Sequence, residues 1–217
     1  MARHVAIRVL CKWCRREMAT PGQLVKAMAA TLGLSEATVG QYDRVLAENG
    51  LRSKGGRGLS AARVTAADAA NLLIAIMASP ISGAAIKEAA HSCKLYGALT
   101  DREKADRDQR CQEFRTKGLV KLADLPPRHS FRDALVSLIE QAADDGMTNC
   151  PIPTGHVNVE SPRPLAEIFA DGPMDYYGLV YTSKRQPKKW PWGTLSQSRI
   201  VNLRTFWQLA ATLQKGE

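Results

Sequence analysis

Proline divides this 217-residue sequence into two parts with different folding possibilities. Prolines stand at positions 151, 153, 162, 164 and 173. Because proline lacks an amide hydrogen and its ring clashes with the preceding turn, these positions exclude a long helix. Alternating apolar and polar residues at 156–160, 176–181 and 198–203 predict strands, and residues 203–213 predict a terminal helix. The part before the prolines has helical periodicity, so the expected fold class is α+β.

Capping residues define the first two helices. Residues 20–23 (TPGQ) form a capping box with proline at the first helical position. Gly33 ends this helix, because glycine adopts the left-handed conformation without a steric penalty. Ser35 caps a second helix, which Asn49 and Gly50 close. The apolar faces of the two helices consist of Leu24, Ala27, Met28 and Thr31, and of Val39, Tyr42 and Leu46.

Further start and stop patterns lie between the second helix and the strands. Residues 51–65 suit a β-hairpin with glycines at its tip. Residues 65–68 begin a helix that is apolar nearly all round, and another helix is expected over residues 82–96. Residues 100–103 form a capping box before a charged segment that is either an exposed helix or a connector. Ser130 begins the last helix of this part, which ends near residue 145.

The positive charge is concentrated near the start of the chain. The net charge is +9, and residues 1–65 carry 11 Lys and Arg against 4 Asp and Glu. A local basic excess favours a polyanionic partner, with nucleic acid first. No apolar run approaches the ~20 residues that a membrane span requires. Five scattered cysteines indicate a reducing compartment, so a soluble cytoplasmic protein without membrane contact is expected.

Residues 25–45 (VKAMAATLGLSEATVGQYDRV) carry the pattern with the clearest functional meaning. Ala29 stands where two helices would cross, Gly33 stands in the turn, and Val39 and Tyr42 would anchor the second helix. In these positions the segment resembles the helix-turn-helix of bacterial DNA-binding proteins. The resemblance covers about twenty residues and implies that the second helix enters the major groove of DNA.

The segment that follows extends this resemblance. Glycines and cations at 52–63 occupy the place of the wing in winged helix-turn-helix proteins, and the helix start at 65–68 follows in the order found in MerR-like regulators. Those proteins continue into a long dimerisation coiled coil, which this sequence lacks, so their mode of dimerisation is not carried over. Residues 54–75 (KGGRGLSAARVTAADAANLLIA) also resemble regulatory proteins of prophages and gene transfer agents.

This resemblance assigns roles to individual side chains. The expected base contacts come from the exposed side of the second helix, because glutamine pairs well with adenine and arginine with guanine. Cations of the wing and the cap of the second helix would hold phosphates, which adds affinity and salt dependence but little sequence preference. The expected base contacts are Thr38, Gln41 and Arg44. The expected phosphate contacts are Ser35, Arg52, Lys54, Arg57 and Arg63.

Residues 182–193 (TSKRQPKKWPWG) form a second basic segment, between two predicted strands. Cations and tryptophans together suit a further nucleic-acid contact, and they also suit a protein partner. A surface loop with its tryptophans packed on the protein is the third alternative. The residues concerned are Lys184, Arg185, Lys188, Lys189, Trp190 and Trp192.

Other chemistries have weaker support. Cys11 and Cys14 have CxxC spacing, but a structural zinc site needs four ligands, and only distant histidines or Cys93 would complete one. Residues 54–60 (KGGRGLS) lack the G-x-x-x-x-G-K-[ST] pattern of a phosphate-binding loop. No ordering of serine, histidine and aspartate indicates a hydrolase. We therefore expect no metal, no cofactor and no enzymatic activity.

Taken together, these patterns predict a sequence-specific transcription regulator of bacterial or phage origin that binds double-stranded DNA as a homodimer. Residues 1–98 would form the winged helix-turn-helix domain, residues 99–149 a helical connector, and residues 150–217 a small α+β module that is available to a protein partner. A phage DNA-packaging or assembly adaptor is one alternative function. A protein-binding module, such as an inhibitor, on the same scaffold is another.

Overall fold

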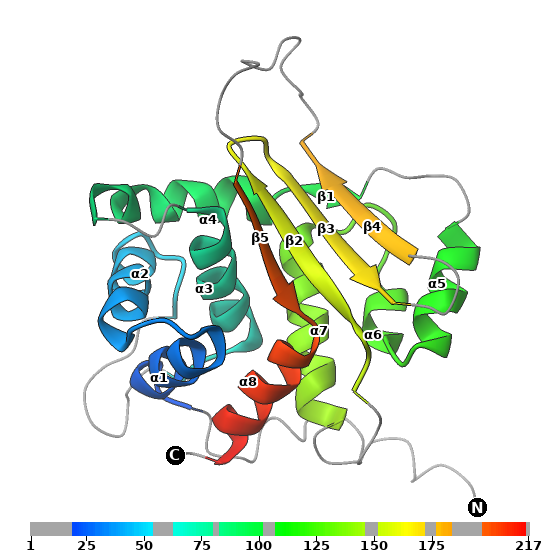
Figure 1. Ribbon diagram of the computed structural model, residues 1–217, viewed down its shortest axis with the longest axis horizontal. Helices are drawn as coiled ribbons and strands as arrows, with labels where there is room; N and C mark the ends of the chain where they lie inside the picture. Colours follow the sequence, from blue (N-terminus) through cyan, green and yellow to red (C-terminus); the bar gives the residue numbers. More distant parts are fainter. Residues whose placement is uncertain are drawn as a thin grey trace, which may run out of the picture.

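The computed structural model describes residues 19–53, 63–79, 83–101, 107–145, 152–171, 177–183 and 197–215 (Figure 1). These residues form helices, one antiparallel sheet and the connections between them, so the expected α+β class is confirmed. Within the described ranges, every helix is too short or too polar to span a lipid bilayer.

The first two helices begin and end where the sequence predicts. Helix α1 (Pro21–Leu32) starts with the Thr20 and Gln23 capping box, and Gly33 ends it in the left-handed conformation at φ 68°. Helix α2 (Glu36–Glu48) is capped by the Ser35 side chain, which accepts a hydrogen bond from the Thr38 amide. These caps satisfy amides that a helix terminus leaves without an intrahelical partner, which fixes both helix starts.

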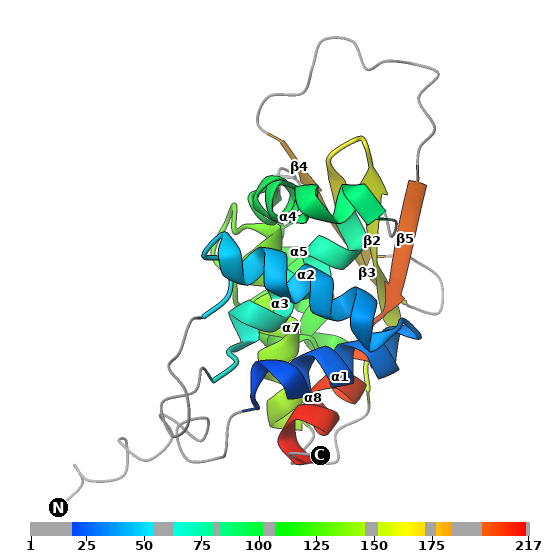
Figure 2. The ribbon, with the colours of Figure 1, turned by 90° about the vertical axis from the view of Figure 1, so that its left-hand side faces the viewer.

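Helix α3 (Ala66–Ala78) occupies the centre of the helical part, and all of its residues except Ala67 are buried. It packs against α2, α4 (Ala89–Gly97) and α7 (Phe131–Asp145). The short helix η3 (Gly83–Glu88) precedes α4, so the helix expected over residues 82–96 begins as a 3-10 helix. Figure 2 shows α1, α2 and α4 lying one above another on the same side of the molecule.

Among the described residues, five strands form one antiparallel sheet in the order β1-β4-β3-β2-β5. Alternation of apolar and polar residues turns one face, with Val157, Ile168 and Tyr181, towards the helices, where these side chains are fully buried. No described helix or strand covers the other face, which looks towards the viewer in Figure 1. The strands are β1 (Thr100–Asp101), β2 (Gly155–Ser161), β3 (Leu165–Ala170), β4 (Tyr177–Thr182) and β5 (Gln197–Asn202).

The structure differs from the local sequence pattern in the middle and in the tail of the chain. Thr100 and Asp101, the first two residues of the capping pattern at 100–103, form β1 and pair with β4 and do not start a helix. Helix α5 (Arg107–Thr116) starts later and buries Phe114, and the four-residue α6 (Val120–Ala123) follows it. Strand β3 was not predicted at all, although it pairs with both β2 and β4. In both places, pairing with distant strands decides the conformation and local pattern does not.

The proline-rich part shares its core with the helical part. Helix α8 (Arg204–Lys215) packs against α1 and α7, and buries Phe206 and Leu209 as expected. The Tyr96 hydroxyl on α4 donates a 2.6 Å hydrogen bond to the Glu160 carbonyl on β2. One hydrophobic cluster extends from Leu24 to Ala210. The described residues thus show a common core across the boundaries expected at 98–99 and 149–150, and the division into modules stays a prediction.

Arg199 joins the sheet to the end of α3. Its guanidinium donates hydrogen bonds to three backbone carbonyls at this helix end, those of Ile76, Met77 and Ser79. The last carbonyls of a helix have no partner within the helix, so a buried helix end needs such donors. Burial lowers the pKa of Arg199 from its ordinary value, while nearby Tyr42 on α2 opposes this shift. The arginine therefore serves a structural purpose at the meeting point of β5, α3 and α2.

Replacing this guanidinium with an apolar chain should destabilise the fold. The variant Arg199→Met leaves buried carbonyls without donors, and we expect a loss of about 1–3 kcal/mol in the free energy of unfolding. Urea denaturation measures the loss. The control is Arg204→Met, which changes an exposed arginine two residues after the strand. Equal stability of the two variants would show that Arg199 does not support the helix end.

A buried histidine connects the sheet to the segment before α7. His129 Nδ1 lies 3.0 Å from the Pro126 carbonyl, and Nε2 lies 2.7 Å from the Tyr181 hydroxyl. A carbonyl only accepts, so Nδ1 carries the proton and Nε2 of the neutral ring accepts from the tyrosine. Desolvation lowers the pKa of His129, although the Pro126 carbonyl opposes the shift. The fold therefore favours the neutral imidazole.

This lowered pKa makes the stability of the fold depend on pH. The folded state lowers the pKa of His129, so the neutral ring contributes fully to the free energy of unfolding above the ordinary imidazole pKa of 6.5. This stabilisation is lost as the pH falls through 6.5 towards the folded-state pKa. Urea denaturation at several pH values between about 5 and 8 measures it. In His129→Gln the slope in this window should become shallower. His91→Gln, an exposed control on α4, should keep the wild-type slope.

Candidate nucleic-acid interface

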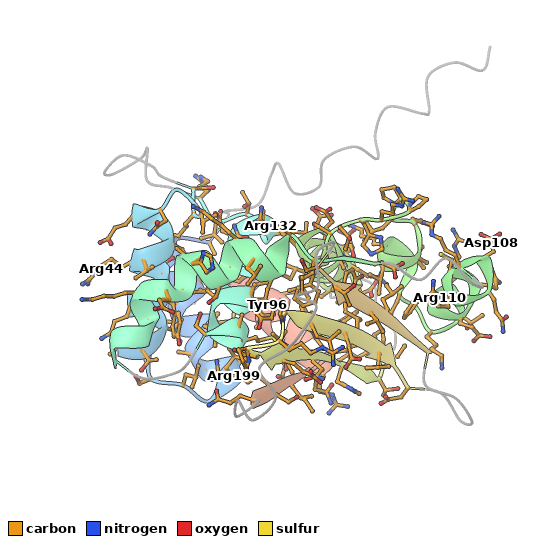
Figure 3. The ribbon with its side chains drawn as sticks, turned by 90° about the horizontal axis from the view of Figure 1, so that it is seen from above. Arg44, Tyr96, Asp108, Arg110, Arg132 and Arg199 are labelled. Atoms are coloured by element: carbon orange, nitrogen blue, oxygen red, sulfur yellow. The ribbon has the colours of Figure 1, made fainter. Side chains whose placement is uncertain are left out.

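The two sides of α2 differ in burial as the sequence predicts. Val39, Tyr42 and Leu46 are buried, and they hold the helix against the core. Gln41 and Arg44 are exposed on the opposite side, in one stripe with Ala37 and Glu48. Figure 3 shows Arg44 pointing away from the body of the protein. Two of the three expected base contacts therefore lie on an accessible helix face.

The start of α2 holds the third expected base contact. Thr38 is half-buried, and its hydroxyl lies 2.8 Å from the Ser35 hydroxyl. The Thr38 amide donates to the same Ser35 oxygen at 3.1 Å. Ser35 itself is exposed at the positive end of the helix dipole, a place that favours anions. The local geometry therefore ties Thr38 to the cap, and leaves Ser35 accessible.

Arg52 has an intramolecular partner that the sequence did not reveal. Its Nε lies 2.9 Å from Asp43 Oδ1, and the two side chains are only 18% and 12% exposed. Burial raises the pKa of Asp43, Arg52 lowers it, and nearby Asp68 raises it. The ion pair attaches the segment after α2 to the helix itself. It also removes Asp43, an acidic residue of α2, from the exposed surface.

Asp68 holds both described ends of the segment expected to be the wing. Its Oδ1 accepts a 2.7 Å hydrogen bond from the Ser53 amide, and its Oδ2 accepts 2.8 Å hydrogen bonds from the Thr65 amide and hydroxyl. Asn71 donates a 2.7 Å hydrogen bond to the Leu51 carbonyl and reinforces the same attachment. One buried carboxylate thus brings Ser53 and Thr65 together at the start of α3.

The described residues at the end of this segment, 63–65, also lie beside the start of α1. The Val64 amide donates a 2.9 Å hydrogen bond to the Ala19 carbonyl, and the neighbouring Arg63 is exposed. Lys54, Arg57 and the expected hairpin tip lie outside the described residues. The described ends, residues 51–53 and 63–65, form no strand. The hairpin expected over 51–65 therefore stays a prediction.

Exposed cations also occur on helices that the sequence did not connect with this site. Lys87 and Lys94 lie on η3 and α4, which both pack against α2. A basic residue on a helix has no distinctive spacing in the sequence, and only the packing of η3 and α4 against α2 relates these two lysines to the site. Lys26 on α1 is exposed as well.

The remaining expected site residues are placed as follows. The second basic segment, with Lys184, Arg185, Lys188, Lys189, Trp190 and Trp192, lies outside the described residues, between β4 and β5. Cys11 and Cys14 also lie outside the described residues. Cys93 is buried, its thiol donates to the Asn71 carbonyl, and desolvation raises its pKa to about 11. This thiol therefore connects α4 to α3 through its hydrogen bond.

The ion pair between Arg52 and Asp43 yields a test of how the segment after α2 is attached. Arg52→Ala leaves a partly buried carboxylate without its cation, and we expect a loss of about 1–2 kcal/mol in the free energy of unfolding. Adding Asp43→Asn removes the charge, so the double variant should regain much of this loss. Urea denaturation of both single variants and the double variant forms the cycle. Additive effects would contradict a direct interaction.

Comparisons with protein-family models, curated proteins and solved structures gave no match to this chain.

Proposed function

We propose that this protein is a sequence-specific DNA-binding transcription regulator with a winged helix-turn-helix. In this proposal α2 is the recognition helix, Gln41 and Arg44 read base edges in the major groove, and the segment at 52–63 contacts phosphates. A homodimer would place two such helices on a palindromic operator, because two-fold protein symmetry matches two half-sites.

The observation that carries the proposal is the division of α2 into a fixed side and an accessible side. A recognition helix must be held rigidly while its outer side chains reach the base edges. Val39, Tyr42 and Leu46 supply the fixed side, since all three are buried. Gln41 and Arg44 are exposed and have the hydrogen-bonding groups that pair bidentately with adenine and guanine.

The attachment of the following segment supports the same proposal. A wing must leave the end of the recognition helix and return beside the helix pair. The Asp68 carboxylate holds Ser53 and Thr65 together, and Val64 bonds to Ala19 at the start of α1. Arg52 contributes through its ion pair with Asp43, so we assign it to holding the wing and assign phosphate contact to Lys54, Arg57 and Arg63.

Charge also favours this side of the protein. Among the described residues of α1 to α4 and their connections, the exposed charges are Lys26, Arg44, Arg63, Lys87 and Lys94, and Glu36, Glu48 and Glu88. None of these five cations forms an ion pair with a described residue. At the opposite end, by contrast, Arg115 pairs with Asp124 at 2.6 Å, and Lys121 pairs with Asp144 at 2.8 Å. Cations without acidic partners are available to phosphates.

The base-reading role of α2 can be tested by selection from pooled genomic and random DNA fragments, followed by titration of the best fragment. Each lost bidentate contact removes ~1–3 kcal/mol of discrimination. Gln41→Ala and Arg44→Ala should therefore bind the selected fragment about tenfold more weakly and relax the preferred sequence. Arg63→Ala should lower affinity for all sequences and reduce the salt slope by about one.

Matched controls separate this role from general charge. Arg163→Ala removes an exposed arginine from the connection between β2 and β3, and should leave binding unchanged. All substituted side chains are exposed, so thermal unfolding should show stability within about 0.5 kcal/mol of wild type. Salt-dependent binding with no enriched sequence would favour a packaging or assembly protein. No binding at any salt concentration would refute a DNA-binding function and favour a protein-binding module.

A further inference from the structure

Strand β5 is an edge of the sheet, and only one of its sides is paired. Six residues, Gln197 to Asn202, pair one to one with β2. Among the described residues, no strand or other backbone group bonds to the second side of β5. Figure 2 shows β5 at the margin of the fold. An edge of this kind presents unpaired amides and carbonyls to any strand that approaches it.

Proteins usually protect such edges, and β5 lacks most of the known protections. Proline, bulges and outward-pointing charges are the common ones. The strand contains no proline, and its register with β2 is continuous. A charge that points inward also protects an edge when a new strand would bury it without a partner. Arg199 points inward, but its guanidinium already donates to carbonyls of α3, so a second strand would leave it satisfied.

The side chains on the exposed face of β5 are apolar at the centre and polar at both ends. Ile200 is 65% exposed, and Ser198 and Asn202 on either side of it are also exposed. If two copies of β5 pair antiparallel about Ile200, the two isoleucines face each other and each serine faces the partner's asparagine. The pattern is thus complementary to itself, as an isologous two-fold interface requires.

We propose that β5 of two copies pairs antiparallel across a two-fold axis at Ile200, which continues the five-stranded sheet of one copy into that of the other. No exposed charge of β5 opposes the contact, although the chain carries a net charge of +9. Only five residues a side, Ser198 to Asn202, pair about this axis. This is fewer than the ~20–30 of a standard interface, so the dimer should dissociate at low protein concentration. This association does not require DNA.

Sedimentation equilibrium over a series of protein concentrations, without DNA, tests the interface. The wild-type protein should pass from monomer to dimer, and Ile200→Lys should remain monomeric, because two ammonium groups would face each other at the axis. The control is Ile152→Lys, which places the same charge at another exposed isoleucine, 42% exposed and outside the sheet. This control should dimerise like wild type.

A crosslinking experiment locates the axis. Facing residues of paired strands lie within the Cα separation that a disulfide spans, so Ile200→Cys should form a covalent dimer under mild oxidation. Ile152→Cys and the wild-type protein, which contains the five native cysteines, should form no more than background. A wild-type monomer at all concentrations would overturn the proposal. So would a dimer that survives Ile200→Lys, since another surface would then hold it.

The outcome is separable from the proposed function. A monomeric wild-type protein that still binds a selected DNA fragment would refute the β5 interface and leave the α2 proposal intact. A β5 dimer that binds no DNA would refute the α2 proposal and leave the interface intact.

Discussion

Burial of both ends of α3 is the constraint on which the rest of the structure depends. A helix leaves amides at its start and carbonyls at its end without intrahelical partners, and buried groups of this kind must be satisfied by the protein. At the start, Asp68 and Thr65 form a capping box, and the same Asp68 carboxylate binds the Ser53 amide. At the end, Arg199 donates to the last carbonyls. These contacts connect the candidate interface to the sheet through one helix.

Helix boundaries that depend on neighbouring residues could be predicted from the sequence. The caps at Thr20, Ser35 and Thr65, and the left-handed turn at Gly33, occur as expected because each satisfies its own helix terminus. The accessible side of α2 follows from the same periodicity. The local pattern therefore predicted which residues of α2 are exposed, and Gln41 and Arg44 are exposed in the structure.

Contacts between distant residues could not be predicted. Arg52 seemed free to bind phosphate because spacing alone does not show that Asp43, nine positions earlier, is buried beside it. Strand β3 was missed because its neighbours along the chain are prolines, and its conformation is decided by pairing with β2 and β4. The common core of α1 and α8 likewise depends on residues that lie far apart in the sequence.

The attachment of Ser53 and Thr65 to one carboxylate has a consequence for how this protein can vary. Because both ends of the intervening chain are fixed by Asp68, its length and composition can change without moving α2 or α3. Lengthening a loop whose ends are already held together costs little, since closure entropy grows only slowly with length. The fold should therefore tolerate insertions, deletions or exchanged sequences between these two residues, while α2 and α3 keep their positions.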